Sequence, residues 1–178
     1  MRTFVAAWPD EPTRQRLAAL ELDHPKNLRP VGPERWHVTL RFLGDVTAAQ
    51  LELLGPALQA GVVAQRGPLR CRLGPATAWF SGVDVLQLPA HGLDELAAAV
   101  TRATERIVAG RAGGEPPFNG HLTLARVKGR LGPEARTRLE GMAFDATFAV
   151  GAVDLVASEP SPRGHVYTTL VRAPLGAG

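Results

Sequence analysis

The chain has 178 residues, of which 45% are hydrophobic, with one cysteine and a formal net charge of +3. This composition supports one hydrophobic core and excludes a disulfide-stapled scaffold and a strongly basic nucleic-acid coat. No segment reaches the roughly 18 apolar residues of a membrane span and no signal peptide is evident, so we expect a single domain over 1–178 in the cytoplasm.

The first half of the chain alternates strand and helix patterns. Polar and apolar residues alternate in two segments, whereas leucines recur at helical spacing in two others. A Pro-Asp-Glu-Pro run opens the first helix, in which Leu17, Leu20 and Ala18 are expected to face inward, and Thr47 is expected to cap the second. The predicted elements are strands over 3–8 and 36–43 and helices over 10–22 and 48–60.

The second half repeats this alternation. Gly-Pro and Ser-Gly turns separate two short apolar runs, and a Gly- and Pro-rich stretch precedes a second motif strand near residue 121. The last two apolar runs predict a hairpin. The predicted elements are strands over 69–73 and 83–88, helices over 91–109 and 132–142, a loop over 110–117, and a hairpin of 148–158 and 164–171 connected by 159–164.

The pattern His-x-Thr-Leu occurs twice, at 37–40 and at 121–124. On a strand, the histidine and threonine of each copy share one face and the apolar residues share the other. The copies lie 84 residues apart, nearly half the chain, which suggests two similar halves meeting across a pseudo-twofold axis. If the strands are neighbours, two imidazoles and two hydroxyls converge on one patch.

These residue types suit in-line attack on a phosphate. One imidazole can take a proton from water while the other gives one to the departing alkoxide, each contributing about 10²–10⁴-fold. Threonine hydroxyls can donate hydrogen bonds to non-bridging phosphate oxygens. Arg41 and Arg126 add guanidinium groups that can bind phosphate in a bidentate fork.

Together the elements predict an α+β fold of two pseudo-symmetric lobes, each contributing one His-x-Thr motif. Helices cover the outside of mostly antiparallel, concave sheets, which form a central groove with His37 and His121 at its base. No His, Cys and Asp cluster offers a metal site, so we expect no metal and no cofactor. Nothing in the helices suggests a coiled-coil seam, so no protein partner is implied and a monomer is expected.

The residues resemble a family. The two motifs, the Phe-Leu-Gly after the first, the Arg after the second and the Gly-x-x-Tyr-Thr at 164–168 are similar to the 2H phosphoesterase superfamily. More narrowly, they resemble its bacterial and archaeal RNA 2′,3′-cyclic phosphodiesterase branch, also called 2′-5′ RNA ligase. The resemblance covers nearly the whole chain and implies that fold.

The resemblance implies metal-independent hydrolysis of a 2′,3′-cyclic phosphate at an RNA end, giving a 2′-phosphate, with a possible reverse ligation. It implies His37 and His121 as the catalytic pair, with His121 assigned as base and His37 as acid, although the reverse is open. Thr39, Thr123 and Arg126 would bind the phosphate. Alternatives are a phosphodiesterase for a small molecule such as ADP-ribose 1″,2″-cyclic phosphate and a non-catalytic nucleotide- or RNA-binding module.

Three further residues are candidate substrate contacts. Strict alternation points Arg41 into the groove and Arg126 away from it, yet the resemblance assigns the phosphate contact to Arg126, so a bend or bulge is expected there. Phe42 holds in the first motif the position of Arg126 in the second, and is either a base contact or buried. His165 lies where similar enzymes bring a loop to the groove rim, while His24 and His91 are expected at the surface.

Overall fold

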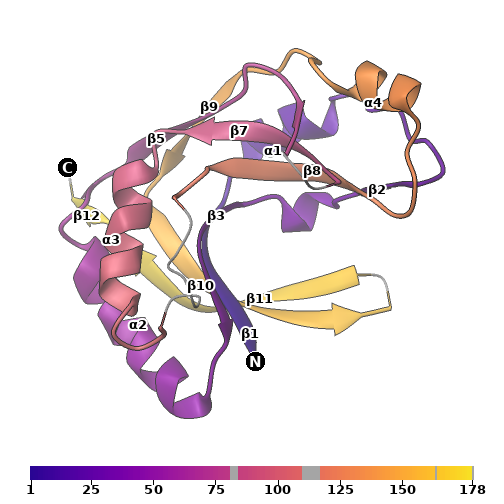
Figure 1. Ribbon diagram of the computed structural model, residues 1–178. Coiled ribbons are helices and arrows are strands. Elements are labelled where there is room, and N and C mark those ends of the chain that lie inside the picture. Colours follow the sequence, from indigo (N-terminus) through magenta and orange to yellow (C-terminus); the bar gives the residue numbers. More distant parts are fainter. Residues whose placement is uncertain (81–83, 110–116, 163, 178) are drawn as a thin grey trace.

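The computed structural model describes residues 1–80, 84–109, 117–162 and 164–177 (Figure 1). Its main feature is a curled sheet of ten strands whose paired strands run antiparallel, in the order β11-β10-β1-β3-β8-β7-β5-β9, with β2 beside β8 and β6 beside β7. The other two strands, β4 and β12, form a separate parallel pair. The strands are β1 (Arg2–Ala7), β2 (Leu28–Pro30), β3 (Val38–Asp45), β4 (Arg66–Gly67), β5 (Leu69–Leu73), β6 (Ala78–Trp79), β7 (Val85–His91), β8 (His121–Val127), β9 (Ala146–Val150), β10 (Ala152–Ser161), β11 (Gly164–Pro174) and β12 (Gly176–Ala177).

Four α-helices lie outside this sheet in the described part of the chain, with α2 and α3 packed side by side (Figure 1). Thr47 caps α2 as predicted, in a reciprocal capping box with Gln50. The predicted α+β class, with helices outside a curled antiparallel sheet, is confirmed. The helices are α1 (Glu11–Ala18), α2 (Ala48–Val62), α3 (Asp94–Thr104) and α4 (Pro133–Leu139), with a 3-10 turn η1 (Pro33–Arg35) before β3.

One large core lies between the helices and the sheet. It includes the apolar residues of both motif strands, among them Val38, Leu40, Leu122 and Leu124, all of which are buried. A smaller cluster on the opposite side of the sheet brings Phe4 and neighbouring apolar residues together with Trp8 and Tyr167. The core therefore supports the motif strands from behind, and the histidine and threonine of each motif face the other way.

Several predicted boundaries are wrong. The helix predicted over 10–22 ends at Ala18, which is exposed, and only Thr13 and Leu17 of it are buried. The helix predicted over 91–109 begins at Asp94, because the chain up to His91 continues β7 in its pairing with β5. The helix predicted over 132–142 is shorter, as α4.

The end of the chain also differs from the prediction. The strand predicted over 148–158 is two strands, because Gly151 separates β9, which pairs with β5, from β10, which pairs with β1 and β11. The hairpin strands continue to Ser161 and from Gly164, so the predicted connection is much shorter. Most of the predicted loop over 110–117, and the predicted Ser-Gly turn, lie outside the described residues.

Across the described ranges, no helix has the length and apolar character needed to cross a membrane. That the chain forms one domain of two similar lobes stays a prediction.

Candidate active site

The two motif strands lie next to each other. β3 and β8 pair antiparallel, with Val38 directly opposite Leu122. Because each of these residues is flanked by the histidine and threonine of its own motif, this register relates the two motifs by a local twofold axis. The face of the sheet that carries the two histidines and two threonines is called the motif face below.

A β-bulge interrupts both motif strands at the same place. Opposite β1, Arg41 pairs with Val5 and Thr39 with Ala6, so that Leu40 is the extra residue. Opposite β7, Ala125 pairs with Leu86 and Thr123 with Gln87, so that Leu124 is the extra residue. The bulge expected in the second motif is thereby confirmed. A bulge shifts the alternation by one residue, so the position five after each histidine returns to the motif face.

Arg41 therefore does not lie on the motif face, and the alternation argument that pointed it there is wrong. It is 5% exposed and donates hydrogen bonds to Thr104 Oγ1 (2.5 Å) and to the Val108 carbonyl (3.2 Å). Arg126 instead is exposed on the side of the histidines, where its charge affects both of them. Of the two arginines that the sequence offered, Arg126 therefore lies on the same side of the sheet as the histidines and Arg41 does not.

His37 sits in an aromatic environment. Its Nδ1 lies 2.6 Å from the Arg35 carbonyl oxygen, and its Nε2 lies 3.1 Å from Thr39 Oγ1. Its ring stacks on Phe4, at 4.9 Å between centroids, and contacts Trp8 and Tyr167, each at 5.3 Å. These contacts fix the ring plane and remove most of its hydration.

His121 repeats the backbone contact of His37 in a more open setting. Its Nδ1 lies 2.8 Å from the Asn119 carbonyl oxygen, again two residues before the histidine, and its ring lies 4.7 Å from that of Phe80. A carbonyl oxygen only accepts, so in the neutral ring Nδ1 carries the proton and Nε2 carries the lone pair. The same holds for His37, and each Nε2 is the atom available for proton transfer.

Both imidazoles are held neutral. Burial lowers the pKa of His37 from 6.5 to about 4, with smaller contributions from the charges of His121 and Arg126 and an opposing one from the Arg35 carbonyl. Burial also lowers the pKa of His121, and Arg126 lowers it further. A phosphate bound between these groups would supply the missing negative charge and raise both values.

The neighbouring strands make the motif face asymmetric, which the sequence did not reveal. Beside the first motif, β1 carries Ala6, and beside the second, β7 carries Gln87, a buried residue whose Oε1 has no hydrogen-bond partner among the described residues. Gln87, Phe4 and Trp8 were missed as neighbours of the motifs because strand pairing brings them there, whereas Tyr167 was part of the pattern at 164–168. The signal for Gln87 was a polar residue within an apolar run.

The remaining candidates differ in accessibility. Phe42 is 59% exposed, with its ring 6.2 Å from that of Phe4, so it lies on the motif face and is not buried. His165 is exposed on β11, with Nδ1 2.9 Å from Ser158 Oγ, and its role as a substrate contact stays a prediction. His24 and His91 are exposed, as predicted.

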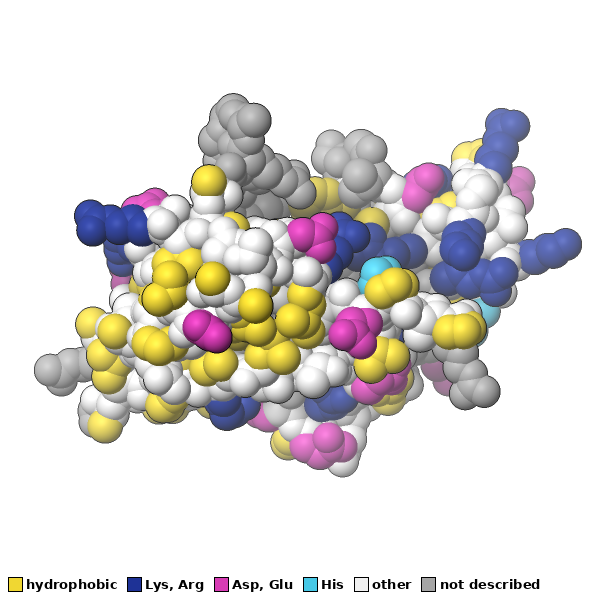
Figure 2. All heavy atoms as spheres, turned by 90° about the horizontal axis from the view of Figure 1, so that it is seen from below, with side chains coloured by type: hydrophobic (Ala, Val, Ile, Leu, Met, Phe, Trp, Pro, Cys, Tyr) yellow, Lys and Arg dark blue, Asp and Glu magenta, His cyan; other side chains and the backbone are white. Residues whose placement is uncertain are grey.

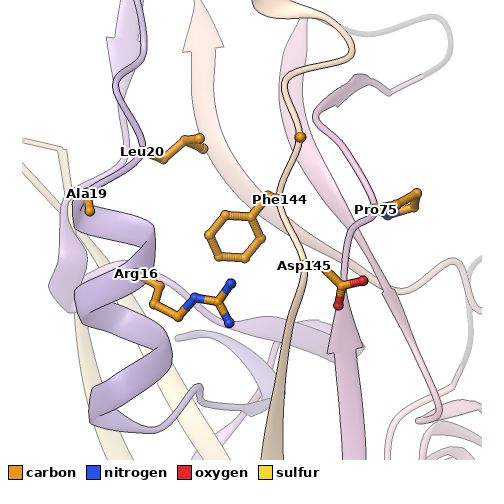
Figure 3. Close-up of a pocket in the computed structure, with 7 residues that line it drawn as sticks. Arg16, Ala19, Leu20, Pro75, Phe144 and Asp145 are labelled. Atoms are coloured by element: carbon orange, nitrogen blue, oxygen red, sulfur yellow. The ribbon is translucent and has the colours of Figure 1, made fainter.

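Two surface features lie outside the motif face. An open hollow between α1 and the start of β9 is lined by Arg16, Leu20, Phe144, Asp145 and small neighbours, and contains no motif residue (Figure 3). Figure 2 shows hydrophobic side chains gathered over one part of the surface and basic side chains gathered elsewhere, next to a histidine. Leu53 of α2 and Val63, the residue that follows α2, are among the exposed apolar residues.

The chain is similar in sequence to one family of phosphoesterases. Residues 8–66 match the family model described as LigT-like phosphoesterase. The chain is 30% identical to an RNA 2′,3′-cyclic phosphodiesterase of Thermus thermophilus, over 96% of this chain and 88% of the relative. It is 32% identical to the Escherichia coli protein of that name, over 83% of this chain and 80% of the relative.

Solved structures agree with these matches. A crystal structure of a Thermus thermophilus protein superimposes with a TM-score of 0.85 and 29% identity, covering 99% of both chains. That of Escherichia coli LigT complexed with NADP+ gives a TM-score of 0.73 and 28% identity, covering 98% of this chain and 97% of the other.

Proposed function

The chain belongs to the LigT-like phosphoesterase family, and from this premise we propose that it hydrolyses 2′,3′-cyclic phosphates at RNA ends to 2′-phosphates. The observation that supports this most strongly is the pair of histidines. Two Nε2 lone pairs, on neighbouring strands and on one face of the sheet, lie where the charge of one arginine reaches both rings.

The reaction needs only proton transfers and one displacement at phosphorus. The water oxygen forms a bond to phosphorus, and the bond from phosphorus to the ribose 3′ oxygen breaks. One histidine takes a proton from the water, and the other gives its proton to the 3′ oxygen. Thr39, Thr123 and Arg126 are the proposed phosphate ligands, because hydroxyl and guanidinium groups donate to non-bridging oxygens.

We assign His121 as base and His37 as acid, although burial lowers the pKa of His37 in the free protein to about 4, which by itself suits a base. A substrate with sulfur in place of the 3′ oxygen decides between the two, because a thiolate departs without a proton. The variant of the acid should regain most of its rate on this substrate. Rescue of His121→Ala instead of His37→Ala would reverse the assignment.

The same site can run the reaction backward, with a 5′-hydroxyl of RNA in place of water, to form a 2′-5′ linkage. In dilute solution water is in large excess, so hydrolysis is expected to dominate. Because proton transfer and fixed donors account for each step, we expect neither direction to need a metal.

The test is to incubate the protein, with EDTA, with a short RNA that ends in a 2′,3′-cyclic phosphate and to identify the product. We expect a 2′-phosphate, at a rate unaffected by EDTA. Recovery of unchanged RNA would refute the proposal. It would bring forward the small cyclic phosphates, tested with ADP-ribose 1″,2″-cyclic phosphate, and the binding module, tested by RNA affinity without turnover.

A further inference from the structure

Arg29 faces Arg126 across two paired strands. In the pairing of β2 with β8, these two arginines are directly opposite each other, and both are exposed. Residues directly opposite on antiparallel strands project to the same face, with Cβ atoms about 4.5–5.5 Å apart. Arg29 therefore extends the motif face by one strand beyond Arg126.

Neither arginine has an acidic partner among the described residues. Like charges placed directly opposite destabilise a sheet, so this pair costs folding free energy that an anion would offset. Several other arginines are instead neutralised by a nearby carboxylate. Those in ion pairs with carboxylates are Arg14, Arg35, Arg72, Arg136, Arg138 and Arg172.

The two arginines lie on different strands, Arg126 on β8 with His121 and Arg29 on the neighbouring β2. The charge of Arg126 lowers the pKa of both histidines, whereas Arg29 is among the causes of neither shift. Arg126 is thus placed for the phosphate between the histidines, and Arg29 is placed for a second anion next to it. Lys128 and Arg130, which follow β8, are exposed and likewise have no acidic partner in the described structure.

We propose that Arg29 binds the phosphodiester immediately 5′ of the cyclic end, an upstream phosphate site that rests on the proposed function. A 2′,3′-cyclic phosphate closes the 3′ end of its strand, so any further backbone charge of the substrate lies on the 5′ side. A guanidinium is suited to such a phosphate because its planar donors match two of the oxygens. The site makes an oligonucleotide a better substrate than a cyclic mononucleotide.

Three substrates test this. The first is adenosine 2′,3′-cyclic phosphate, which has no upstream phosphate. The second is the adenylyl dinucleotide with the same cyclic end, and the third is that dinucleotide with a neutral methylphosphonate in place of its upstream phosphodiester. We expect the wild-type protein to prefer the second over the third by about tenfold in kcat/KM, the scale of one hydrogen-bonded contact to a charged group.

Arg29→Gln should abolish that preference and leave kcat/KM for the mononucleotide within about twofold, while Arg29→Lys should keep part of it. Arg102→Gln, an exposed charge change on α3, is the matched control and should change nothing. Arg29→Gln should unfold at a temperature no lower than wild type, because it relieves the repulsion with Arg126. With longer RNA, log kcat/KM falls as log salt rises, and this decline should be shallower for Arg29→Gln than for wild type by about 0.7 in slope.

If Arg29→Gln lost activity equally on all three substrates, Arg29 would lie at the reacting phosphate and the upstream site would be refuted. The upstream site would also be refuted if Arg29→Gln kept the wild-type preference for the dinucleotide over its methylphosphonate analogue. Failure of the wild-type protein to hydrolyse any of the three would refute the proposed function itself. The two failures are therefore distinguishable.

Discussion

His37 and His121 share one backbone contact but differ in their surroundings. Each Nδ1 is held by the carbonyl two residues earlier, so both rings present Nε2. His37 is enclosed by Phe4, Trp8 and Tyr167, and burial lowers its pKa to about 4. The free site is therefore electrically neutral at its imidazoles, with Arg126 as the nearby cation, and an anionic substrate brings the charge that completes it.

The lowered pKa values predict an acidic optimum of kcat/KM. For a general acid and a general base, this optimum lies midway between the two pKa values of the free protein. Both histidines lie below their usual 6.5, so the optimum should fall below about pH 6.5. A pH profile with the cyclic-phosphate RNA, at constant ionic strength, measures it. An optimum above pH 7 would contradict the proposed burial effect.

The same shift predicts how stability depends on pH. Between about pH 4 and 6.5 the unfolded chain binds a proton at His37 that the folded chain does not, so the free energy of unfolding rises with pH in that window. At pH 4 the loss relative to pH 7 is up to about 3 kcal/mol from this residue. Urea unfolding of the wild-type protein and His37→Gln at pH 4, 5.5 and 7 should show it. Parallel pH dependences of the two proteins would contradict the shift.

Sequence alone identified the two histidines and two threonines, because the repeated motif contains them in a fixed local spacing. It did not identify Gln87 or Arg29, because these residues meet the motifs only through strand pairing. The aromatic enclosure of His37 comes from β1 and β11, which are distant in the chain. Local spacing predicts which residues share a face, whereas the partners across the sheet require the register.

Within the two motif strands, the paired β-bulges decide which side chains lie on the motif face. They place Arg126 and Phe42 on the motif face and Arg41 on the opposite face, which packs against the core. In both strands the bulge brings the fifth residue after the histidine to the motif face. This residue is Phe42 in β3 and Arg126 in β8. In the proposed reaction, Phe42 would contact a base and Arg126 would bind the phosphate.

This assignment predicts opposite outcomes for two chemically identical substitutions. Arg41→Met should lower the free energy of unfolding by about 2–3 kcal/mol, because it leaves the Val108 carbonyl without its donor. Arg126→Met should change stability by less than about 0.5 kcal/mol, since it is exposed, but lower kcat/KM about 10²–10³-fold. Urea unfolding and steady-state rates on both variants test the contrast. A stable, inactive Arg41→Met with an active Arg126→Met would contradict the bulge argument.

Element boundaries were less predictable than element types. Thr47 and its capping box marked the start of α2, because a cap is a local hydrogen-bond pattern. The division at Gly151 depended on which strand each segment pairs with, which no local pattern records. The edge strand β2 contains Arg29, the proposed upstream phosphate ligand. It has only three residues, too few for an alternating pattern that would predict a strand.

At the scale of the whole molecule, the fold joins two distant motifs through one pair of strands. β3 and β8 touch at Val38 and Leu122, and both residues are buried in the large hydrophobic core. The core therefore positions the site from behind, while the motif face stays polar along its centre. The symmetric placement of two imidazoles about this contact is what would let the proposed acid and base act on one phosphate.

We propose that the two histidines act together as acid and base in one step, and a double-variant cycle tests this proposal. We would measure kcat/KM for the cyclic-phosphate RNA, in EDTA, with wild type, His37→Ala, His121→Ala and the double variant. Each single variant should lose about 10³-fold or more, and the double variant should be no more than about tenfold worse than the weaker single. Losses that multiply, or a single variant that keeps the wild-type rate, would contradict the account.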